Sequence, residues 1–300
     1  MSHLRSSSLD YDRPVKVGDG IYWVGTTEMD HGWRPNPYCV VDQAEAVLID
    51  AGSRAQFTSL ILKIMQMGLP PSAIKALVYQ SADPRLWGGL RHLEALIHRK
   101  DLKVISHKAF LALGQQHVES SIPCSLEDIG HRLEFSSGRT LEFFQVPFAC
   151  SSGSFVTFDR KSGVLFSGDL FSSQMVQEKG LFLELGMECR RCEGHSVCPR
   201  SEQECPVFAM LQFHRENISS EKALQYALKR IASVPYQVLA PHQGRLISGT
   251  EDIAHLNFLL TSLKEVGIDA FPGECSLCRM KSEPNGHAKY PETDGRLSVA

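Results

Sequence analysis

Long apolar segments are missing from this 300-residue sequence. No stretch approaches the roughly 18 consecutive apolar residues that a helix needs to cross a membrane. Residues 1–14 are polar and charged and lack the apolar run of a secretory signal. The sequence therefore predicts no membrane partner and a cytoplasmic, reducing location.

An excess of charge of one sign is missing too. The formal net charge is −3, from 31 basic and 34 acidic side chains, which provides no electrostatic basis for binding nucleic acid. The sequence also has no internal repeat. With 43% hydrophobic and 22% charged residues, the composition is that of an ordinary globular protein with one large domain or two smaller ones.

Cysteine, in contrast, is concentrated in one place. Four cysteines fall within 17 residues of a polar segment without hydrophobic periodicity: Cys189, Cys192, Cys198 and Cys205. Such a segment predicts a loop rather than a core helix or strand. The chain has nine cysteines, an odd number, and cysteine clusters in reducing compartments usually bind metal or take part in redox chemistry.

Two kinds of metal centre fit these cysteines. Four thiolates suit a [4Fe–4S] cluster, and a proline after a ligand cysteine, as after Cys198 and Cys205, often accompanies such clusters. The Cys-x2-Cys-x5-Cys spacing is also similar to that of oxygen-sensing iron–sulfur regulators. Structural Zn²⁺ is the alternative, with a Cys-x-x-Cys knuckle and His195 as a substitute ligand. We favour the cluster over zinc, and both over disulfides or uncoordinated thiols.

A second cysteine pair, Cys275 and Cys278, lies in a segment rich in Pro, Gly, Ser and charge. This composition predicts a flexible tail with two exposed thiols rather than a second metal site. The expected organisation is a flexible start, one domain, a cysteine-rich insert inside that domain, and a flexible tail: residues 1–14, 15–270, 186–206 and 271–300.

The pattern of apolar residues alternates between strands and helices. Strands are predicted where β-branched and aromatic residues run between turn residues, and helices where apolar residues recur every three or four positions. The strands are expected at 15–26, 38–41, 46–50, 74–79, 103–106, 131–135, 140–146, 154–159, 164–167 and 238–240. The helices are expected at 57–68, 86–98 and 252–266, with two more after the insert, the second opened by Ser219. This order predicts an α/β fold with two sheets between layers of helices.

Five short motifs occur in an order that resembles the metallo-β-lactamase superfamily. They are the segments 48–52, 88–89, 153–156, 166–171 and 240–244. The resemblance covers about residues 15–263, and the segments 167–171 and 213–217 resemble the flavodiiron and oxygen-binding diiron branch. It implies a four-layer αββα sandwich with a pocket for two metal ions.

The resemblance also implies where the metal ligands would lie. In the superfamily, the loop after the second main strand carries His-x-His-x-Asp-His before Gly-Gly, and an acid replaces the second histidine in the diiron branch. With Gly88-Gly89 setting the register, these positions fall on Ser81, Asp83, Arg85 and Leu86. The later ligand positions fall on Cys150, Asp169 and Gln243, with His242 displaced by one.

Arg85 changes the chemistry expected of this pocket. Two metal ions bring four positive charges and need several carboxylates and imidazoles, whereas here a guanidinium cation stands among few ligands. Arg85 is expected to pair with Asp83 or Asp169. The sequence thus predicts a vestigial pocket formed by Asp83, Arg85, Cys150, Asp169, His242 and Gln243. Asp83 before Pro84 is also an ordinary helix cap or turn former, and Cys150 can equally be a packing residue.

These features together predict a sensor or regulatory module rather than an enzyme. A [4Fe–4S] cluster in the insert would respond to oxygen or redox state, and the signal would pass to a protein partner or a fused output domain. The sequence is also compatible with a homodimer. One alternative is a metal-dependent hydrolase or diiron oxidoreductase with an atypical non-haem iron site. The other is a zinc-stabilised interaction protein.

Overall fold

The computed structural model describes residues 9–28, 33–51, 53–114, 118–174, 180–193 and 205–271. The chain divides into two units, Met1–Ala270 and Phe271–Ala300, and the description below concerns the first. Four residues singled out in the sequence lie outside the described residues: His195, Cys198, Cys275 and Cys278. No helix of the described part has the length and apolar character needed to span a membrane.

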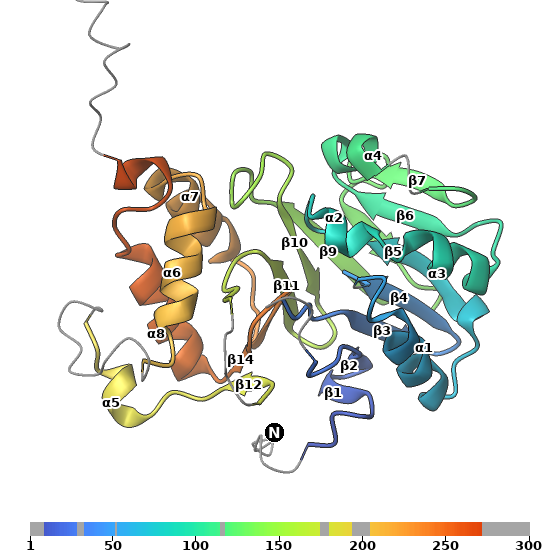
Figure 1. Ribbon diagram of the computed structural model, residues 1–300, viewed down its shortest axis with the longest axis horizontal. Helices are drawn as coiled ribbons and strands as arrows, with labels where there is room; N and C mark the ends of the chain where they lie inside the picture. Colours follow the sequence, from blue (N-terminus) through green and yellow to red (C-terminus); the bar gives the residue numbers. More distant parts are fainter. Residues whose placement is uncertain are drawn as a thin grey trace, which may run out of the picture. The chain divides into compact units, whose positions relative to one another are not determined.

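The first sheet has the strand order β1-β2-β3-β4-β5-β6-β7 (Figure 1). Strands β1 to β4 pair antiparallel, and β4 to β7 pair parallel. Their bounds are Val15–Gly18, Ile21–Trp23, Tyr38–Asp42, Glu45–Ile49, Ile74–Val78, Lys103–Ser106 and Ile122–Ser125. The helices between them are α1 (Phe57–Gln66), the 3-10 helix η2 (Pro71–Ala73), α2 (Pro84–Trp87), α3 (Leu90–Ile97) and α4 (Lys108–Gly114).

The second sheet has the strand order β12-β14-β13-β11-β10-β9-β8. The bounds of β8 to β14 are Arg132–Glu134, Thr140–Gln145, Phe155–Asp159, Val164–Gly168, Phe182–Leu183, Val238–Pro241 and Leu246–Ser248. Its helices are α5 (Met187–Arg190), α6 (Phe208–Asn217), α7 (Glu221–Ile231), α8 (Thr250–Thr261) and the 3-10 helix η5 (Ile268–Ala270). Strand β11 pairs parallel with β13, so the chain segments after these two strands leave the sheet at the same edge.

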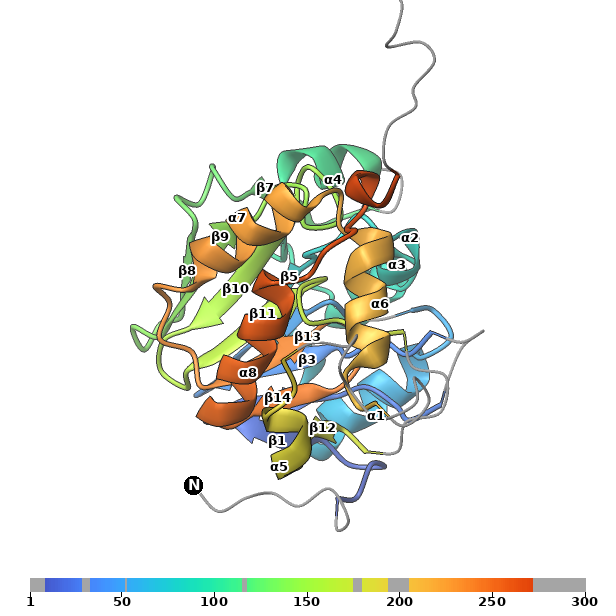
Figure 2. The same ribbon diagram turned by 90° about the vertical axis from the view of Figure 1, so that its left-hand side faces the viewer.

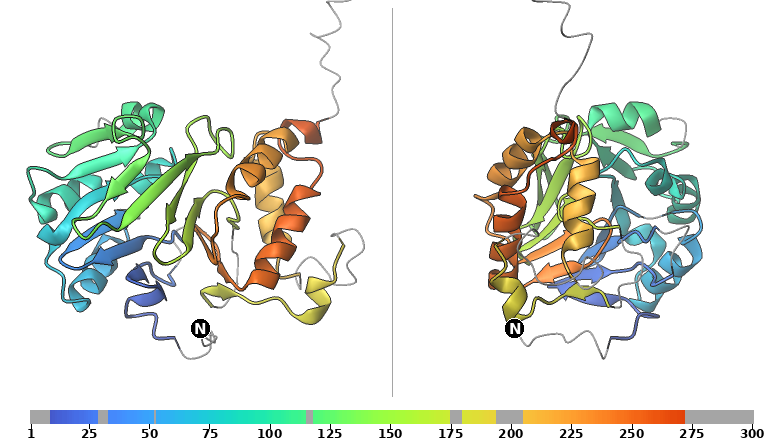
Figure 3. Two further views of the ribbon diagram at one scale, coloured as in Figure 1. Left: turned by 180° about the vertical axis from the view of Figure 1, so that it is seen from behind. Right: turned by 60° about the vertical axis from the view of Figure 1, so that its left-hand side comes forward.

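Three apolar clusters hold the layers together. The cluster between the sheets contains side chains of both, such as Val78 and Phe166. A second cluster packs α1 and α3 on the outer face of the first sheet, through residues such as Leu60. A third packs α6, α7 and α8 on the outer face of the second sheet, through residues such as Leu228 and Leu256 (Figures 2 and 3). The expected α/β fold, a four-layer αββα sandwich, is confirmed.

Some element boundaries differ from the sequence-based expectation. The helix expected at 86–98 is two helices, because Gly88 and Gly89, poor helix formers, lie between α2 and α3. Helix α7 is capped by Ser220, whose hydroxyl accepts a backbone hydrogen bond at 3.1 Å, and not by Ser219. The short elements α4, α5, β7, β12 and β14 were not anticipated, because so few residues show no clear periodicity.

A buried ion pair ties the two sheets together. Arg139 Nε and Nη2 donate to the two carboxylate oxygens of Asp159, each at 2.8 Å, within the second sheet. The same guanidinium donates to the carbonyls of Val41 at 3.0 Å and Asp19 at 2.8 Å, which belong to the first sheet and its β1–β2 turn. Both charged side chains are at most 1% exposed. This satisfies the bonding requirement of a buried guanidinium, whose burial would otherwise be costly.

His214 fixes the segment that follows β11. Its imidazole lies on α6 and is fully buried. Nε2 accepts a hydrogen bond from the Phe171 backbone N–H at 3.0 Å, and Nδ1 donates to the Met210 carbonyl at 2.7 Å. Burial lowers the pKa of His214 to about 4. The neutral ring thus holds the turn that contains Asp169 against α6.

We expect His214 to make the folded protein less stable as the pH falls from about 6.5 towards 4. The imidazole binds a proton in the unfolded chain below its ordinary pKa of about 6.5, but in the folded protein only near pH 4, so acid favours unfolding in this window. The loss is on the order of 3 kcal/mol at the acidic end.

Urea unfolding between pH 4.5 and 7 tests this expectation. His214→Gln keeps an oxygen that can accept from the Phe171 N–H but does not titrate. The difference in the free energy of unfolding between wild type and variant should therefore change with pH across this window. Titrating groups that both proteins share contribute equally to each and drop out of the difference. A difference that is constant across the window would contradict the role assigned to His214.

Candidate functional site

A cluster of buried or partly buried polar side chains, called the pocket below, lies where segments from both sheets meet. Asp50 directly follows β4, and Asp83 lies in the segment after β5. Asp169 follows β11, His242 follows β13, and Cys150 lies in the connection between β9 and β10. Strands β4 and β5 are parallel neighbours, as are β11 and β13. Their carboxyl ends therefore deliver polar side chains to one place, as in other sheets of this kind.

Asp169 makes the central contacts of the pocket. Its Oδ1 lies 3.2 Å from His242 Nε2, and the Cys150 thiol donates a hydrogen bond to its carboxylate. Burial raises the pKa of Asp169, His242 opposes that shift, and the nearby charge of Asp83 adds to it. The other oxygen, Asp169 Oδ2, and His242 Nδ1 are both buried without a hydrogen-bond partner. The structure thus brings Asp83, Cys150, Asp169 and His242 together.

Cys150 is held here as a protonated thiol. Burial raises the pKa of Cys150 to about 12, and the negative charges of Asp169 and Asp83 contribute to the shift. Its backbone has a φ of +93°, which residues other than glycine rarely adopt. The strained backbone places the thiol against Asp169, whereas metal binding would require the thiolate.

A second buried carboxylate, Asp50, is bound by residues that sequence reasoning missed. Its Oδ1 accepts from the Gln80 backbone N–H at 2.9 Å, and its Oδ2 from Gln80 Nε2 at 3.2 Å. The Gln80 side-chain oxygen in turn accepts from the Thr157 hydroxyl at 2.6 Å. Burial raises the pKa of Asp50 to about 6, and the charge of His242 partly opposes this. The side-chain amide of Gln80 therefore links the two sheets through hydrogen bonds to the Asp50 carboxylate and the Thr157 hydroxyl.

The loop that carries His242 is held by the first sheet. Asn36 Nδ2 donates to the carbonyls of Pro241 at 3.1 Å and Gly244 at 2.8 Å. The Tyr38 hydroxyl also donates to the Pro241 carbonyl, at 2.8 Å, and the Asn36 N–H donates to the His242 carbonyl at 2.6 Å. Asn36 and Tyr38 were also not anticipated. The only signal in the sequence was a polar residue between two prolines, immediately before a strand.

Arg85 pairs with Asp83, one of the two partners expected for it. Three side-chain contacts of 2.5–3.0 Å join the guanidinium to both carboxylate oxygens. Asp83 also caps α2, accepting from the Arg85 backbone N–H at 2.9 Å, so the ordinary capping role holds as well. Burial alone would raise the pKa of Asp83, but its bonds to Arg85 lower it. The Arg85 guanidinium lies 4.3 Å from the centre of the Trp33 ring.

The residues of this pocket do not fit a pair of metal ions. Leu86, at one ligand position, is fully buried in the apolar cluster under α3. At another position the Ser81 hydroxyl accepts from the Asp83 backbone N–H, and the position expected for the last histidine ligand carries Gln243, a neutral amide. Asp83 is already neutralised by Arg85. Within the described residues, no group of three or more His, Cys, Asp or Glu side chains could hold a metal ion.

Two cysteines of the insert contact the core, although most of the described residues around Cys189 are exposed. Cys189 lies on α5 and packs against the apolar cluster beneath α6 to α8, while Cys205 is buried within that cluster. No disulfide joins any two of the cysteines that the structure describes. Cys189 thus lies on a short helix rather than in the expected loop, whereas Cys205 lies outside any helix or strand, as expected; both side chains make apolar contacts despite the polar sequence around them. Because Cys198 lies outside the described residues, the metal centre expected here stays a prediction.

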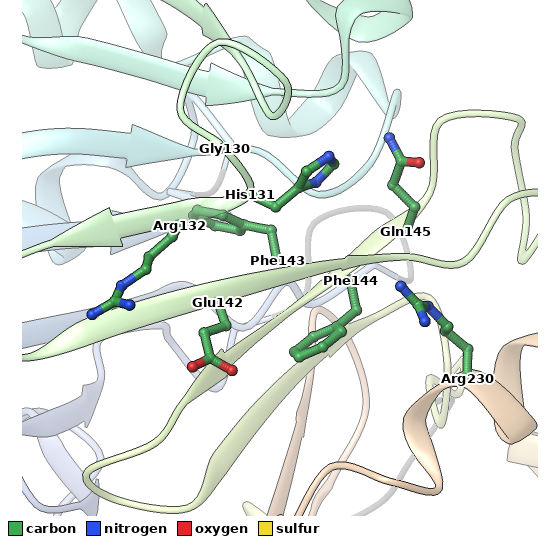
Figure 4. Close-up of a pocket in the computed structure, with 8 residues that line it drawn as sticks. All are labelled: Gly130, His131, Arg132, Glu142, Phe143, Phe144, Gln145 and Arg230. Atoms are coloured by element: carbon green, nitrogen blue, oxygen red, sulfur yellow. The ribbon is translucent and has the colours of Figure 1, made fainter.

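A hollow of about 420 Å³ lies elsewhere, on the second sheet beside α7 (Figure 4). It is lined by Gly130, His131, Arg132, Glu142, Phe143, Phe144, Gln145 and Arg230. Its carboxylate, Glu142, is bound by the two nitrogens of Arg160 at 3.0 and 2.9 Å. The charged side chains of the hollow lie on β8, β9 and α7 and point in different directions, so it does not form a second polar site.

We expect Asp169→Asn to leave the stability of the protein within about 1 kcal/mol of wild type, or to raise it. The amide keeps an oxygen for Cys150 and His242 and removes a buried negative charge that burial disfavours. Thermal unfolding at pH 7 measures the effect. If the wild-type protein binds metal and Asp169→Asn both loses that metal and becomes markedly less stable, Asp169 is a metal ligand. Ser167→Ala, which removes a hydroxyl bonded only to the Leu170 carbonyl, is a matched control on the same turn.

Comparison with known proteins agrees with the fold. A solved structure of the chemotaxis sensor ODP in a peroxy diiron state has 20% sequence identity and a TM-score of 0.65, covering 83% of this chain and 92% of that chain. The rubredoxin oxygen:oxidoreductase of Desulfovibrio gigas has 18% identity and a TM-score of 0.61, covering 82% and 60%. Diflavin flavoprotein A 1 of Synechocystis sp. is 24% identical over 182 residues, which is 60% of this chain but 29% of that protein.

The family is established by a match along the sequence. The model described as "ODP family beta lactamase" matches residues 34–244, which is most of the chain. The matched range contains the pocket residues Asp50, Asp83, Cys150, Asp169 and His242, as well as the cysteine insert. The chain therefore belongs to the ODP family of β-lactamase-fold proteins, with a pocket whose ligand residues differ from the pattern of the superfamily.

Proposed function

We propose that this chain is a sensor or regulatory module that responds to oxygen or redox state through a metal centre in the cysteine insert, most simply a [4Fe–4S] cluster. The observation that carries the proposal is the separation of two features within one fold. The pocket in which two metals would lie contains its own partners for the carboxylates, Arg85 on Asp83 and the His242 imidazole beside Asp169. Four other cysteines, by contrast, lie in an insert whose described residues contribute no side chain to the pocket.

The family supports a sensing role in a general way. A chemotaxis sensor is among the proteins of similar fold, covered almost entirely by this chain. A sensor does not need to turn over a substrate, so it can retain a scaffold without its metal ligands. The output would be passed to a protein partner or a further domain.

The surroundings of the insert modify how a cluster would behave. Cys189 and Cys205 pack against apolar side chains, so one side of the centre would be sheltered from solvent. Arg190, next to Cys189, is bound by Asp252 at 2.6 Å and Glu251 at 2.8 Å. Its charge is therefore compensated by carboxylates and contributes little to stabilising thiolates. Oxygen would then reach the centre from the side that faces away from α8, and the solvent exposure of that side would set the sensitivity to oxygen.

Cysteine substitution tests the position of the centre. After anaerobic purification, iron, zinc and acid-labile sulfide are measured in wild type and in Cys189→Ser, Cys192→Ser and Cys205→Ser. Each variant should lose most of the bound metal, because a closed four-ligand site loses much of its affinity with one ligand. Cys39→Ser, at a buried cysteine of the first sheet, is the control and should keep the metal. Sulfide together with iron indicates a cluster, whereas zinc alone indicates the structural alternative.

A second candidate is metal binding in the family pocket, and two atoms favour it. Asp169 Oδ2 and His242 Nδ1 are buried without partners and could hold a non-haem iron or zinc ion once the Cys150 thiol is deprotonated. A variant lacking the insert cysteines separates the two functions. Little bound metal in that variant supports the sensor, while one or two equivalents would favour a hydrolase or oxidoreductase with an atypical site.

We also expect the centre to respond to air. An anaerobically prepared protein should lose its visible absorption on exposure, and cleavage by protease within residues 186–206 should increase as it does so, since the metal holds the insert together. A chelator-treated sample gives the rate of cleavage expected for an insert without metal. A cluster that persists for hours in air, or cleavage that is the same with and without it, would leave a structural or electron-transfer role.

A further inference from the structure

Residues 9–13 precede β1 and lie close to the edges of both sheets. Strand β1 is an edge strand of the first sheet and β12 an edge strand of the second, and both are found at the same end of the molecule (Figures 1 and 2). Leu9 and Tyr11 pack against the apolar cluster between the sheets. The Tyr11 ring meets the Trp23 ring edge-on, with 6.1 Å between the ring centres.

A buried ammonium group holds this segment on the side of the first sheet. Lys63 lies on α1 and is only 4% exposed, and its Nζ donates to the carbonyls of Tyr11, at 2.6 Å, and Gly25. Nζ also lies 4.4 Å from the centre of the Trp23 ring, within the range of a cation–π contact. Burial lowers the pKa of Lys63 to about 8, and carboxylates of residues 9–13 oppose the shift. Burying an ammonium group costs free energy, and the bonds to this segment offset part of that cost.

The Tyr11 hydroxyl holds the same segment on the side of the second sheet. It accepts a hydrogen bond from the Leu181 backbone N–H at 3.2 Å, and the Leu181 carbonyl accepts one from Leu246 of β14 at 2.8 Å. Leu181 lies at the start of the described segment 180–193, which continues through β12 into α5 and carries the first two cysteines of the insert. Tyr11 therefore reaches the base of the cysteine insert.

Much of residues 9–13 faces solvent, so this segment can open while the sheets stay folded. Asp10, Asp12 and Arg13 are exposed, and Leu9 and Tyr11 are only partly buried. Segments of this kind open at a lower free energy than the core of a protein. Strand β12 is itself short, and its ladder with β14 consists of two residue pairs. Its position therefore depends on neighbouring contacts such as the bond from Leu181 to Tyr11.

We propose that residues 9–13 form a latch, closed by the Lys63 ammonium and the Tyr11 hydroxyl, whose opening releases segment 180–193 from the edge of the second sheet. In the sensor proposed above, this release moves the first two cysteines of the insert away from the buried Cys205 and loosens the metal centre. That consequence rests on the proposed function, whereas the latch itself requires no metal.

Hydrogen–deuterium exchange of the full chain, followed by mass spectrometry, tests the latch. Tyr11→Phe removes only the hydroxyl, so peptides covering residues 180–185 should exchange about fivefold faster, as expected for one lost hydrogen bond. Lys63→Met keeps the length of the side chain but loses both bonds to carbonyls, so the same peptides should exchange about tenfold faster or more. Peptides of β10, in the core of the second sheet, should keep the wild-type rate in both variants.

Lys75→Met is the matched control. Lys75 also donates to a carbonyl, that of Glu134 at 2.9 Å, and lies 5.4 Å from the centre of an aromatic ring, that of Phe135. It belongs to β5 and not to the latch, so residues 180–185 should exchange at the wild-type rate in this variant. Wild-type exchange of these residues in both latch variants, or an equal increase in β10, would overturn the latch.

Release of metal to a chelator from anaerobically prepared protein separates the latch from the function. Faster exchange and faster metal release in Lys63→Met support both. Faster exchange in a protein without cysteine-dependent metal supports the latch and overturns the proposed function. Unchanged exchange in a protein with cysteine-dependent metal overturns the latch and leaves the proposed function intact.

Discussion

Buried negative charge is the constraint on which the site depends. Asp50 and Asp169 lie inside the protein, where ionised carboxylates are costly unless a cation or several hydrogen bonds compensate them. In a pocket with two metal ions, the metals provide that compensation. Here a histidine, a thiol and an amide do so through short-range contacts, and the pKa of Asp50 is raised to about 6. The side chains of the pocket therefore compensate this charge only in part, and burial still raises the pKa of both Asp50 and Asp169.

The same constraint explains why the scaffold is preserved around an altered pocket. Asn36 and Gln80 each bond to segments of the opposite sheet or of the pocket loops, and Arg139 does the same at another edge of the sandwich. These bonds hold the segments of the pocket without any metal. A fold held in this way can accept a new metal centre in an insert, because the insert is attached through α5 and α8 rather than through the pocket.

Parts of the site could be predicted because they depend on short-range patterns. Asp83 before Pro84 predicted a helix cap, and Arg85 nearby in sequence predicted an ion pair, which the structure contains. Asn36, Gln80 and Thr157 could not be found this way. Their partners lie far away in the chain, up to 208 residues for Asn36 and Gly244, and a single polar residue near a strand carries no information about a partner at that distance.

The sequence by itself determined the α/β class, the order of the main strands and helices, and the concentration of cysteines, because periodicity and composition are local properties. Its resemblance to the superfamily also predicts which ligand positions lack a metal-binding side chain. Only the tertiary structure decided that Cys189 and Cys205 pack against the core, and that Gln80 and Thr157 bond across the two sheets. Burial and pairing of this kind arise only when segments that are distant in sequence meet. Those contacts, rather than the polar residues next to each cysteine in sequence, decide whether the cysteine is buried.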